Sequence, residues 1–246
     1  MAVLVLNRSV YLSASCQEHN VGIDGVTEED RMQALVRDVA SILAKTSLTV
    51  YLNKPEWTLA QVVADSNSKK PDLHLALHSN SGKGLASGTE TWCYGVVGTK
   101  SAEFGVLLQI SLVGVLGLPD RGIKDGTVPG NRLAEIVQVK ATSALTEIFF
   151  HDSARDVARF KERRQAVVEA VAREVCGWLD VEYPKVVEAI TTQAPWVPDK
   201  AKIHVGSTTV EGVMIDEKVY APVRALLDAM ERRLTWDDAT KTVTII

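Results

Sequence analysis

The sequence predicts an α/β fold, a twisted and mostly parallel sheet flanked by helices, followed by a small α+β C-terminal domain. Three observations carry this prediction. Short strand-like runs alternate with longer segments that have one apolar face. The 246 residues, 46% hydrophobic and 24% charged, suffice for one full domain and a small second one. A proline-bearing stretch then precedes a final segment of different character.

The strands and helices of the first domain are distinguished by the period of their apolar residues. The expected strands are 10–15, 48–53, 73–79, 89–96 and 144–150. The expected helices are 29–45, 56–67, 101–116 and 154–179. The last helix carries valines and a leucine on one face, at helical spacing, so we expect it to pack on the sheet.

The domain boundaries follow from the same pattern. We expect a first domain over residues 1–180, a linker over 181–199 that holds three of the eight prolines, and a small domain over 200–246. The small domain reads as short strands, a helix that begins at Pro222, and two further strands. Because its core is small, we expect it to be a targeting module or to associate, either with the first domain or as a homodimer.

Composition excludes several classes of function. The formal net charge of −4, without a block of Lys or Arg, argues against a nucleic-acid partner. The three cysteines are far apart and show no CxxC spacing, so no disulfide framework is expected. No apolar stretch is long enough for a transmembrane segment. The first 15 residues read as a strand without a signal peptide, which predicts synthesis in the cytoplasm and action on its target after release by another route.

Two histidines lie four positions apart in the sequence LHLALHSN. On a helix, His74 and His78 would share a face, but the alternating leucines indicate a strand, along which residues four apart are separated by roughly 13 Å. One metal therefore cannot bind both. His78 lies at the carboxyl end of the strand, where open α/β sheets bind their ligands, and His74 is expected to be structural.

A catalytic zinc site needs about three protein ligands, an open position for water and a nearby carboxylate. The sequence offers His19 in the loop after the first strand, Glu28 and Glu29 at a helix start, His78, and Glu147 within the strand ALTEIFF. Glu147 is the most telling, because a carboxylate among apolar residues is costly to bury without a cation or a proton. Glu28 and Glu29 also fit an ordinary helix start with Thr27 as its N-cap.

Two further residues allow other roles. Cys16, three residues before His19, is a candidate thiol nucleophile, although catalytic pairs are assembled in space and adjacency in sequence is little evidence. His151, four residues after Glu147, is either a substrate-binding residue or a histidine of a surface loop. Neither forms part of the expected zinc site.

The motifs LHLALHSN, DRGIK and ALTEIFFHDSARD, in this order after the loop with His19, resemble the zinc-dependent N-acetylmuramoyl-L-alanine amidases of the amidase-3 type, especially phage and prophage lysins of spore-forming bacteria. The resemblance covers about residues 8–180. It implies that His19, Glu29 and His78 hold zinc and that Glu147 is the catalytic base and acid. Glu29 is selected over Glu28 by counting back four from Gln33, at the position of the family's usual Asn.

The resemblance implies a peptidoglycan hydrolase that cleaves the amide bond between N-acetylmuramic acid and L-alanine. Two alternatives stay open: a metal-free cell-wall-binding protein with the amidase fold, and a zinc peptidase that cuts the stem peptide. Residues 200–246 resemble the small repeat found at the front of copper amine oxidases. Nothing in this segment indicates copper, since His204 is its only histidine.

Overall fold

The computed structural model describes residues 8–184 and five strands within residues 199–245. The chain divides into two compact units, Met1–Thr191 and Thr192–Ile246. The division falls within the stretch predicted to be a linker. The module boundaries and the role of the C-terminal module stay predictions.

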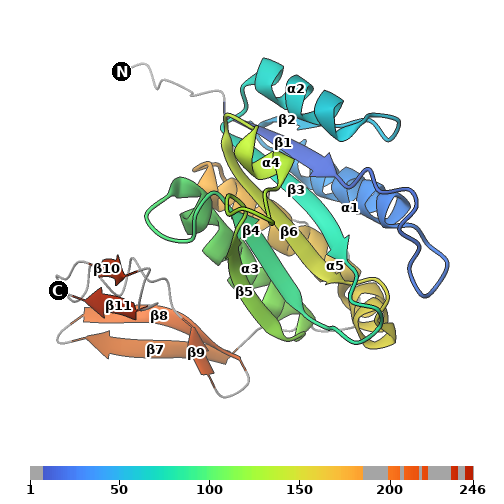
Figure 1. The fold of residues 1–246 in the computed structure, drawn as a ribbon. Coiled ribbons are helices and arrows are strands. Elements are labelled where there is room, and N and C mark those ends of the chain that lie inside the picture. The colour runs from blue at the N-terminus through green and yellow to red at the C-terminus, as the bar shows by residue number, and fades with distance from the viewer. Residues whose placement is uncertain are drawn as a thin grey trace. The chain divides into compact units, whose positions relative to one another are not determined.

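The first unit is built on a six-stranded mixed sheet with the order β2-β1-β3-β6-β4-β5 (Figure 1). Its strands are β1 Ser9–Ala14, β2 Thr49–Leu52, β3 Leu73–Asn80, β4 Thr89–Cys93, β5 Asp120–Asp125 and β6 Thr142–Phe150. Four of these strands, β2, β1, β3 and β6, run parallel to one another. The other two run in the opposite direction, because β4 is antiparallel to β6 and β5 is parallel to β4. The predicted α/β fold with a mostly parallel sheet is confirmed.

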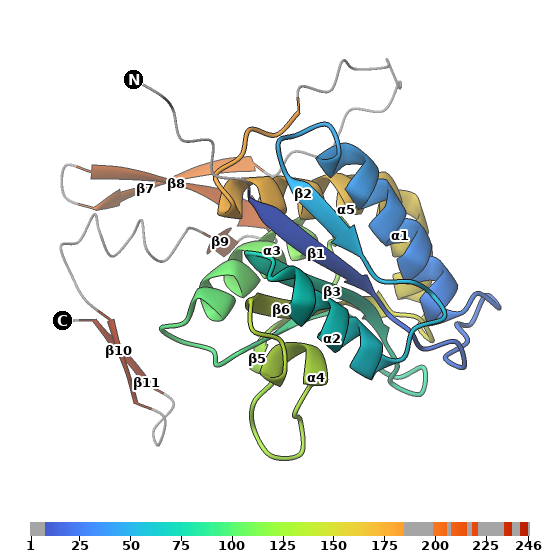
Figure 2. The ribbon, with the colours of Figure 1, turned by 90° about the horizontal axis from the view of Figure 1, so that it is seen from above.

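Helices cover both faces of this sheet (Figure 2). The helices are α1 Glu28–Leu43, α2 Leu59–Lys69, α3 Lys100–Leu116, α4 Ala134–Val137 and α5 Ala154–Trp178. The main core joins α1, α3 and α5 to the sheet, and a small second cluster joins α4 to β3 and β6 through Ile136, Ala76 and Leu145. Strand β3 therefore has a core on each side: its odd-numbered leucines enter the main core, and its even-numbered residues face α4.

The start of α1 sets the position of the acidic residues that follow it. Thr27 is the N-cap and its side chain accepts a hydrogen bond from the backbone N–H of Asp30. Glu28, Glu29 and Asp30 occupy the first turn, where carboxylates are stabilised by the helix dipole. Glu28 is buried there, whereas Asp30 is exposed. The helix start thus directs one of three adjacent acids into the protein.

All five strands and four helices expected for the first domain are present, with ends that differ by a few residues. Strand β5 and the short helix α4 were not predicted. In the C-terminal unit, β7 Asp199–Val205, β8 Thr208–Ile215 and β9 Lys218–Tyr220 form an antiparallel sheet, and β10 Leu234–Asp237 pairs with β11 Thr242–Ile245. The helix predicted to begin at Pro222 lies outside the described residues.

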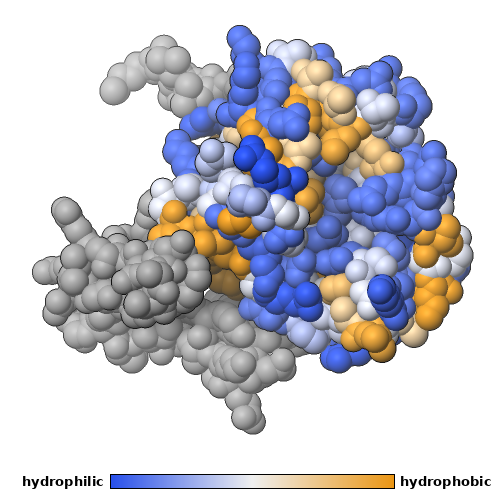
Figure 3. All heavy atoms as spheres, viewed as in Figure 1, coloured by the Kyte–Doolittle hydropathy of each residue, from blue (hydrophilic) through white to orange (hydrophobic). Residues whose placement is uncertain are grey.

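The surface of the described residues is mostly hydrophilic in the view of Figure 3, and the hydrophobic residues form small separate patches. Within the part of the chain that the structure describes, no helix has both the length and the apolar character needed to span a membrane.

Asp24, in the loop before α1, connects α1 to α5. Its carboxylate lies 2.6 Å from Nη2 of Arg31 and 2.7 Å from Nζ of Lys161, and its side chain is 16% exposed. Burial opposes ionisation of Asp24, but the hydrogen bonds from Lys161 and Arg31 outweigh it and lower the pKa to about 2. A carboxyl with a lowered pKa stabilises the folded state above its unfolded pKa of about 4, and this stabilisation is lost as the pH falls toward 2.

Replacing Asp24 with Asn should therefore lower the free energy of unfolding at pH 7 by about 2 kcal/mol, because Arg31 stays buried without its carboxylate. The difference from the unsubstituted protein should shrink as the pH falls from 4 to 2. Urea unfolding at several pH values measures both effects. Glu162→Gln is the control: Glu162 is 56% exposed and should contribute only about 0.3 kcal/mol through its pair with Arg159. Equal effects of the two substitutions would contradict this account.

Candidate active site

A pocket of about 440 Å³ lies at the carboxyl ends of β1, β2 and β3 and beside β6. Open α/β sheets bind their ligands at this end of the strands. The residues that line it share no single element and come from the loops after β1 and β2, from the end of β3, from within β6, and from α1, α2 and α4. They include Cys16, Glu29, Trp57, His78, Leu133, Glu135 and Glu147.

Strand register places His78 and Glu147 side by side in the pocket. They are paired residues on the neighbouring parallel strands β3 and β6. Because side chains alternate between faces along a strand, both point away from the main core and toward the pocket. His78 is 7% exposed.

Glu28 holds His78 from one side. Its Oε1 lies 2.9 Å from Nδ1 of His78 and also accepts a longer bond of 3.4 Å from the backbone N–H of Ser79. Its Oε2 accepts a hydrogen bond of 2.9 Å from the side chain of Asn20. Burial opposes ionisation of Glu28, yet the bond from His78 and the further bonds lower its pKa below the usual range.

Glu135 faces His78 from the other side. Its Oε1 lies 3.1 Å from Nε2 of His74, whose Nδ1 lies 2.9 Å from Oγ of Ser66. Its Oε2 lies 3.5 Å from Nε2 of His78. That nitrogen is buried and has no hydrogen-bond partner among the described residues. The two carboxylates therefore face opposite nitrogens of one imidazole ring.

The charges in this cluster shift the pKa values of its members in opposite directions. Burial would lower the pKa of His78, but the carboxylates of Glu135 and Glu28 raise it well above its usual range. Burial would raise the pKa of Glu135, but His74 and His78 lower it well below its usual range. In the absence of other cations, a proton on His78 thus balances part of the negative charge of the cluster.

Glu147 differs from the other carboxylates of the site. Burial raises its pKa to about 7, His78 acts against this rise, and the negative charges of Glu28 and Glu90 add to it. Its Oε2 is buried and has no hydrogen-bond partner among residues 8–184. Glu90, opposite Glu147 on β4, is instead satisfied by Arg121, at 2.7 Å, and by Asn80. Glu147 is therefore a buried carboxylate of the pocket that can exchange a proton near neutral pH.

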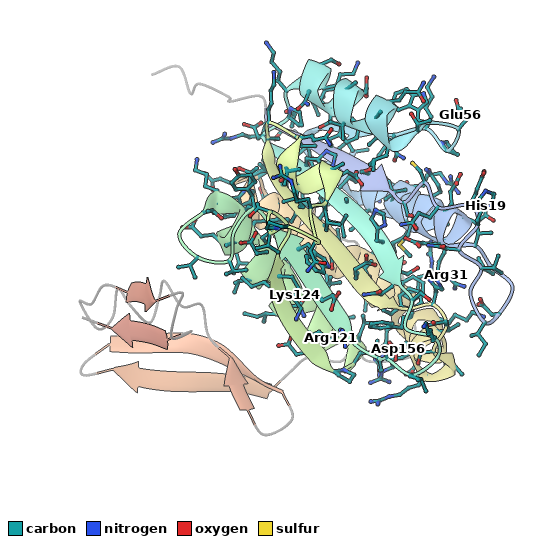
Figure 4. The ribbon with its side chains drawn as sticks, viewed as in Figure 1. His19, Arg31, Glu56, Arg121, Lys124 and Asp156 are labelled. Carbon is teal, nitrogen blue, oxygen red and sulfur yellow. The ribbon has the colours of Figure 1, made fainter. Side chains whose placement is uncertain are left out.

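The predicted site residues are only partly brought together. His78 and Glu147 lie side by side, and Glu29 lines the same pocket, but Glu28 makes the contact with His78. The structure does not bring His19 to this cluster. Its side chain is 92% exposed, lies 3.4 Å from Glu18 and projects from the loop after β1, as Figure 4 shows.

Two further residues of the cluster and its surroundings depart from expectation. Glu135 was missed because it lies on α4, which is too short for a periodic signal; its position between Ala134 and Ile136 in RLAEIV was the available clue. His151 is buried and bonds Ser79, so its interpretation as a surface histidine was wrong. By contrast, His74 is buried and structural, as expected.

Comparison with known proteins identifies the family. The profile of the N-acetylmuramoyl-L-alanine amidase family Amidase_3 matches residues 15–176, a range that runs from the end of β1 nearly to the end of α5. The chain belongs to this family. Family membership makes the chain an enzyme of the amidase class, and such enzymes are generally zinc-dependent.

Solved structures of amidases share the fold of the first unit. The catalytic domain of CwlV, an N-acetylmuramoyl-L-alanine amidase from Bacillus (Paenibacillus) polymyxa var. colistinus, is 24% identical; the match covers 71% of this chain and 99% of that domain, with a TM-score of 0.63. An N-acetylmuramoyl-L-alanine amidase from Clostridium difficile 630 is 18% identical, with coverage of 71% and 97% and a TM-score of 0.64.

Two further relatives are similar over the same part of the chain. The catalytic domain of the CD27L endolysin, which targets Clostridia difficile, is 20% identical, with coverage of 70% of this chain and 98% of that domain and a TM-score of 0.57. The uncharacterized protein YqiI of Bacillus subtilis (strain 168) is 25% identical over 181 residues, which are 70% of this chain and 85% of YqiI.

The pocket offers donors that suit zinc, although they do not form a complete ligand set. Among the described residues, no three His, Cys, Asp or Glu side chains are grouped as a ready metal site. The imidazole nitrogen and carboxylate oxygens that zinc prefers are nevertheless present, and Nε2 of His78 and Oε2 of Glu147 lack hydrogen-bond partners within the described part. The chemistry of the pocket thus fits the metal of the family at His78.

Cys16 lines the pocket but is poorly suited to nucleophilic attack. Burial and the negative charge of Glu135 raise the pKa of its thiol, the hydrogen bond from Asn53 lowers it, and the result is about 11. The thiolate is the reactive form of cysteine, so the neutral thiol of Cys16 argues against the alternative of a thiol nucleophile.

Alkylation by iodoacetamide should therefore be slow at Cys16. At pH 7.5 the thiolate fraction of a group with this pKa is below about 0.1%, and the rate should rise about tenfold per pH unit until pH 11. Peptide mapping by mass spectrometry measures the rate at Cys16 separately from buried Cys93 and Cys176, with glutathione as the reference thiol. A rate at pH 7.5 equal to that of glutathione would show that the thiol is activated.

Proposed function

We propose that the chain cleaves the amide bond between N-acetylmuramic acid and L-alanine in peptidoglycan. In this proposal His78 binds zinc, and Glu147 is the catalytic base and acid. Membership in the amidase family supports the substrate class. The single observation that carries the catalytic assignment is Glu147, which lies beside His78 in the pocket and has a raised pKa and a carboxylate oxygen without a hydrogen-bond partner among the described residues.

The chemistry divides between the metal and the protein. When bound, zinc supplies Lewis-acid polarisation of the amide carbonyl and lowers the pKa of water. Glu147 takes a proton from the attacking water, whose oxygen bonds to the carbonyl carbon. Glu147 then delivers this proton to the amine of L-alanine as the carbon–nitrogen bond breaks, so one water is consumed per bond. A carboxyl with a pKa of about 7 suits both transfers at neutral pH.

The walls of the pocket support binding of a sugar-linked peptide. Trp57, in the loop after β2, and Leu133, just before α4, line it together with the polar cluster. An aromatic side chain beside polar groups is suited to pack against a sugar ring while hydrogen bonds orient the amide. We propose that the pocket receives the lactyl–alanine junction.

One observation favours a second candidate, a metal-free protein with the amidase fold that binds the cell wall. His19 lies outside the pocket, so the three-ligand set implied by the resemblance is not assembled. A zinc peptidase that acts on the stem peptide shares the metal chemistry and differs only in the bond cut. For each of these three candidates, we propose a lysin-like protein that reaches the cell wall after release. We further propose that residues 200–246 form a module that binds the wall or dimerises.

Digestion of purified peptidoglycan followed by mass spectrometry of the muropeptides tests the amidase. We expect lactyl-bearing sugars and peptides with a free amino terminus at L-alanine. Glu147→Gln should lower kcat by at least about 100-fold, because it removes the proton carrier. The variant should still sediment with cell walls. Shortened stem peptides would identify a peptidase instead.

The control is Glu162→Gln, the same chemical change on an exposed side chain of α5. It should digest peptidoglycan like the unsubstituted chain. If Glu147→Gln also kept that rate, the catalytic role of Glu147 would be excluded. If the unsubstituted chain bound walls, carried no zinc and released no products, the second candidate would replace the first.

A further inference from the structure

We propose that Glu135, on α4, shares the zinc with His78, so that α4, and not His19 in the loop after β1, supplies a second protein ligand. The inference deepens the proposed function and rests on it, because it concerns the metal that the function uses. It assigns a ligand that none of the sequence motifs indicated.

The distance between the two side chains suits a shared ion. Oε2 of Glu135 and Nε2 of His78 lie 3.5 Å apart, and this nitrogen has no hydrogen-bond partner within residues 8–184. Two donors at 2.0–2.2 Å from a tetrahedral zinc lie about 3.4 Å from each other. The pair is therefore spaced for a metal that both side chains bind.

The other nitrogen of His78 is engaged in the way that metal-binding histidines require. Nδ1 lies 2.9 Å from Oε1 of Glu28, a normal hydrogen-bond length. Zinc-bound histidines usually donate the N–H of the second nitrogen to a carboxylate, which fixes the tautomer and the ring orientation. With Nδ1–H donated to Glu28, the lone pair of the neutral ring lies on Nε2, toward Glu135.

Glu135 is fixed in the same manner. His74 and Ser66 extend a buried hydrogen-bonded chain to Oε1 of Glu135 and leave Oε2 directed at His78. Both Glu135 and His74 are nearly inaccessible to solvent, with exposures of 4% and 0%. Because these side chains are already ordered, little conformational entropy is lost when the ion binds.

His19 has none of these properties. Its side chain is 92% exposed, and its ion-pair partner is the exposed neighbour Glu18. To reach the pocket it would have to leave solvent and rearrange its loop, in which the backbone N–H of Asn20 bonds the carbonyl of Gln17 and the backbone N–H of Glu28 bonds the carbonyl of Asn20. The geometry thus assigns the ligand role to the buried carboxylate.

Zinc titration of the metal-free full chain, in competition with a chelator of known affinity, tests the proposal without substrate. We expect Glu135→Gln to weaken zinc binding by about 100-fold or more. His19→Ala should change the affinity by less than twofold, and so should Glu162→Gln, the matched change on an exposed glutamate.

Thermal unfolding separates a ligand from a merely structural residue. Zinc should raise the Tm of the unsubstituted chain and of His19→Ala, while this rise should be largely lost in Glu135→Gln. The Tm of metal-free Glu135→Gln should stay within a few degrees of the metal-free unsubstituted chain. If only the metal-free Tm fell and the zinc-induced rise persisted, Glu135 would be structural and the proposal overturned.

Other outcomes separate this inference from the proposed function. Unchanged zinc affinity in Glu135→Gln, or lost affinity in His19→Ala, overturns the inference and leaves the amidase intact if peptidoglycan is still digested. Zinc binding that depends on Glu135, in a chain that releases no muropeptide products, supports the inference and overturns the amidase. Absence of zinc binding in the unsubstituted chain overturns both.

Discussion

The burial of three carboxylates around one imidazole is the constraint on which the rest of the site depends. Glu28 and Glu135 are at least nine-tenths buried, and Glu147 has a buried oxygen. Buried charges are tolerated only where cations or hydrogen bonds compensate for lost hydration. His78 lies between Glu28 and Glu135, so its ring is the positive or metal-binding centre that this arrangement requires.

Strand register enforces this arrangement. His78 and Glu147 are paired across β3 and β6, and Glu90 is paired with Glu147 across β6 and β4. A shift of one residue in β3 would move His78 into the main core and a leucine into the pocket. The apolar packing of Leu73, Leu75 and Leu77 against the helices therefore fixes the position of the functional face as well as the core.

The sequence predicts those parts of the site that lie on helices or strands whose apolar residues recur with a clear period. The alternation in β3 separates His74 from His78, and the apolar neighbours of Glu147 along its strand mark this carboxylate as unusual. Glu28 and Glu29 are adjacent on one helical turn, about 100° apart around the axis. Counting from a family position selects Glu29, but Thr27 caps the helix so that Glu28 turns toward His78.

The parts of the fold and the site that were not predicted lie on elements whose sequences have no periodic pattern of apolar residues. Strand β5 has the sequence DRGIKD and is partly exposed along its length, so it lacks the apolar alternation of a buried strand. Helix α4 has four residues, fewer than two helical turns. Glu135 lies on α4, and its environment arises from β3 and from His74, both distant in sequence. No local sequence pattern could predict the contact between Glu135 and His74, which are 61 residues apart in the sequence.

Preorganisation explains why an unpredicted carboxylate is a better metal ligand than a predicted histidine. A ligand on an exposed loop must lose conformational entropy and hydration when it binds, and the measured affinity is reduced by that cost. Glu135 has already lost both during folding, because His74 and the surrounding core hold it in place. Residue type alone favours histidine for zinc, but the free energy of ordering favours the side chain that the fold has already fixed.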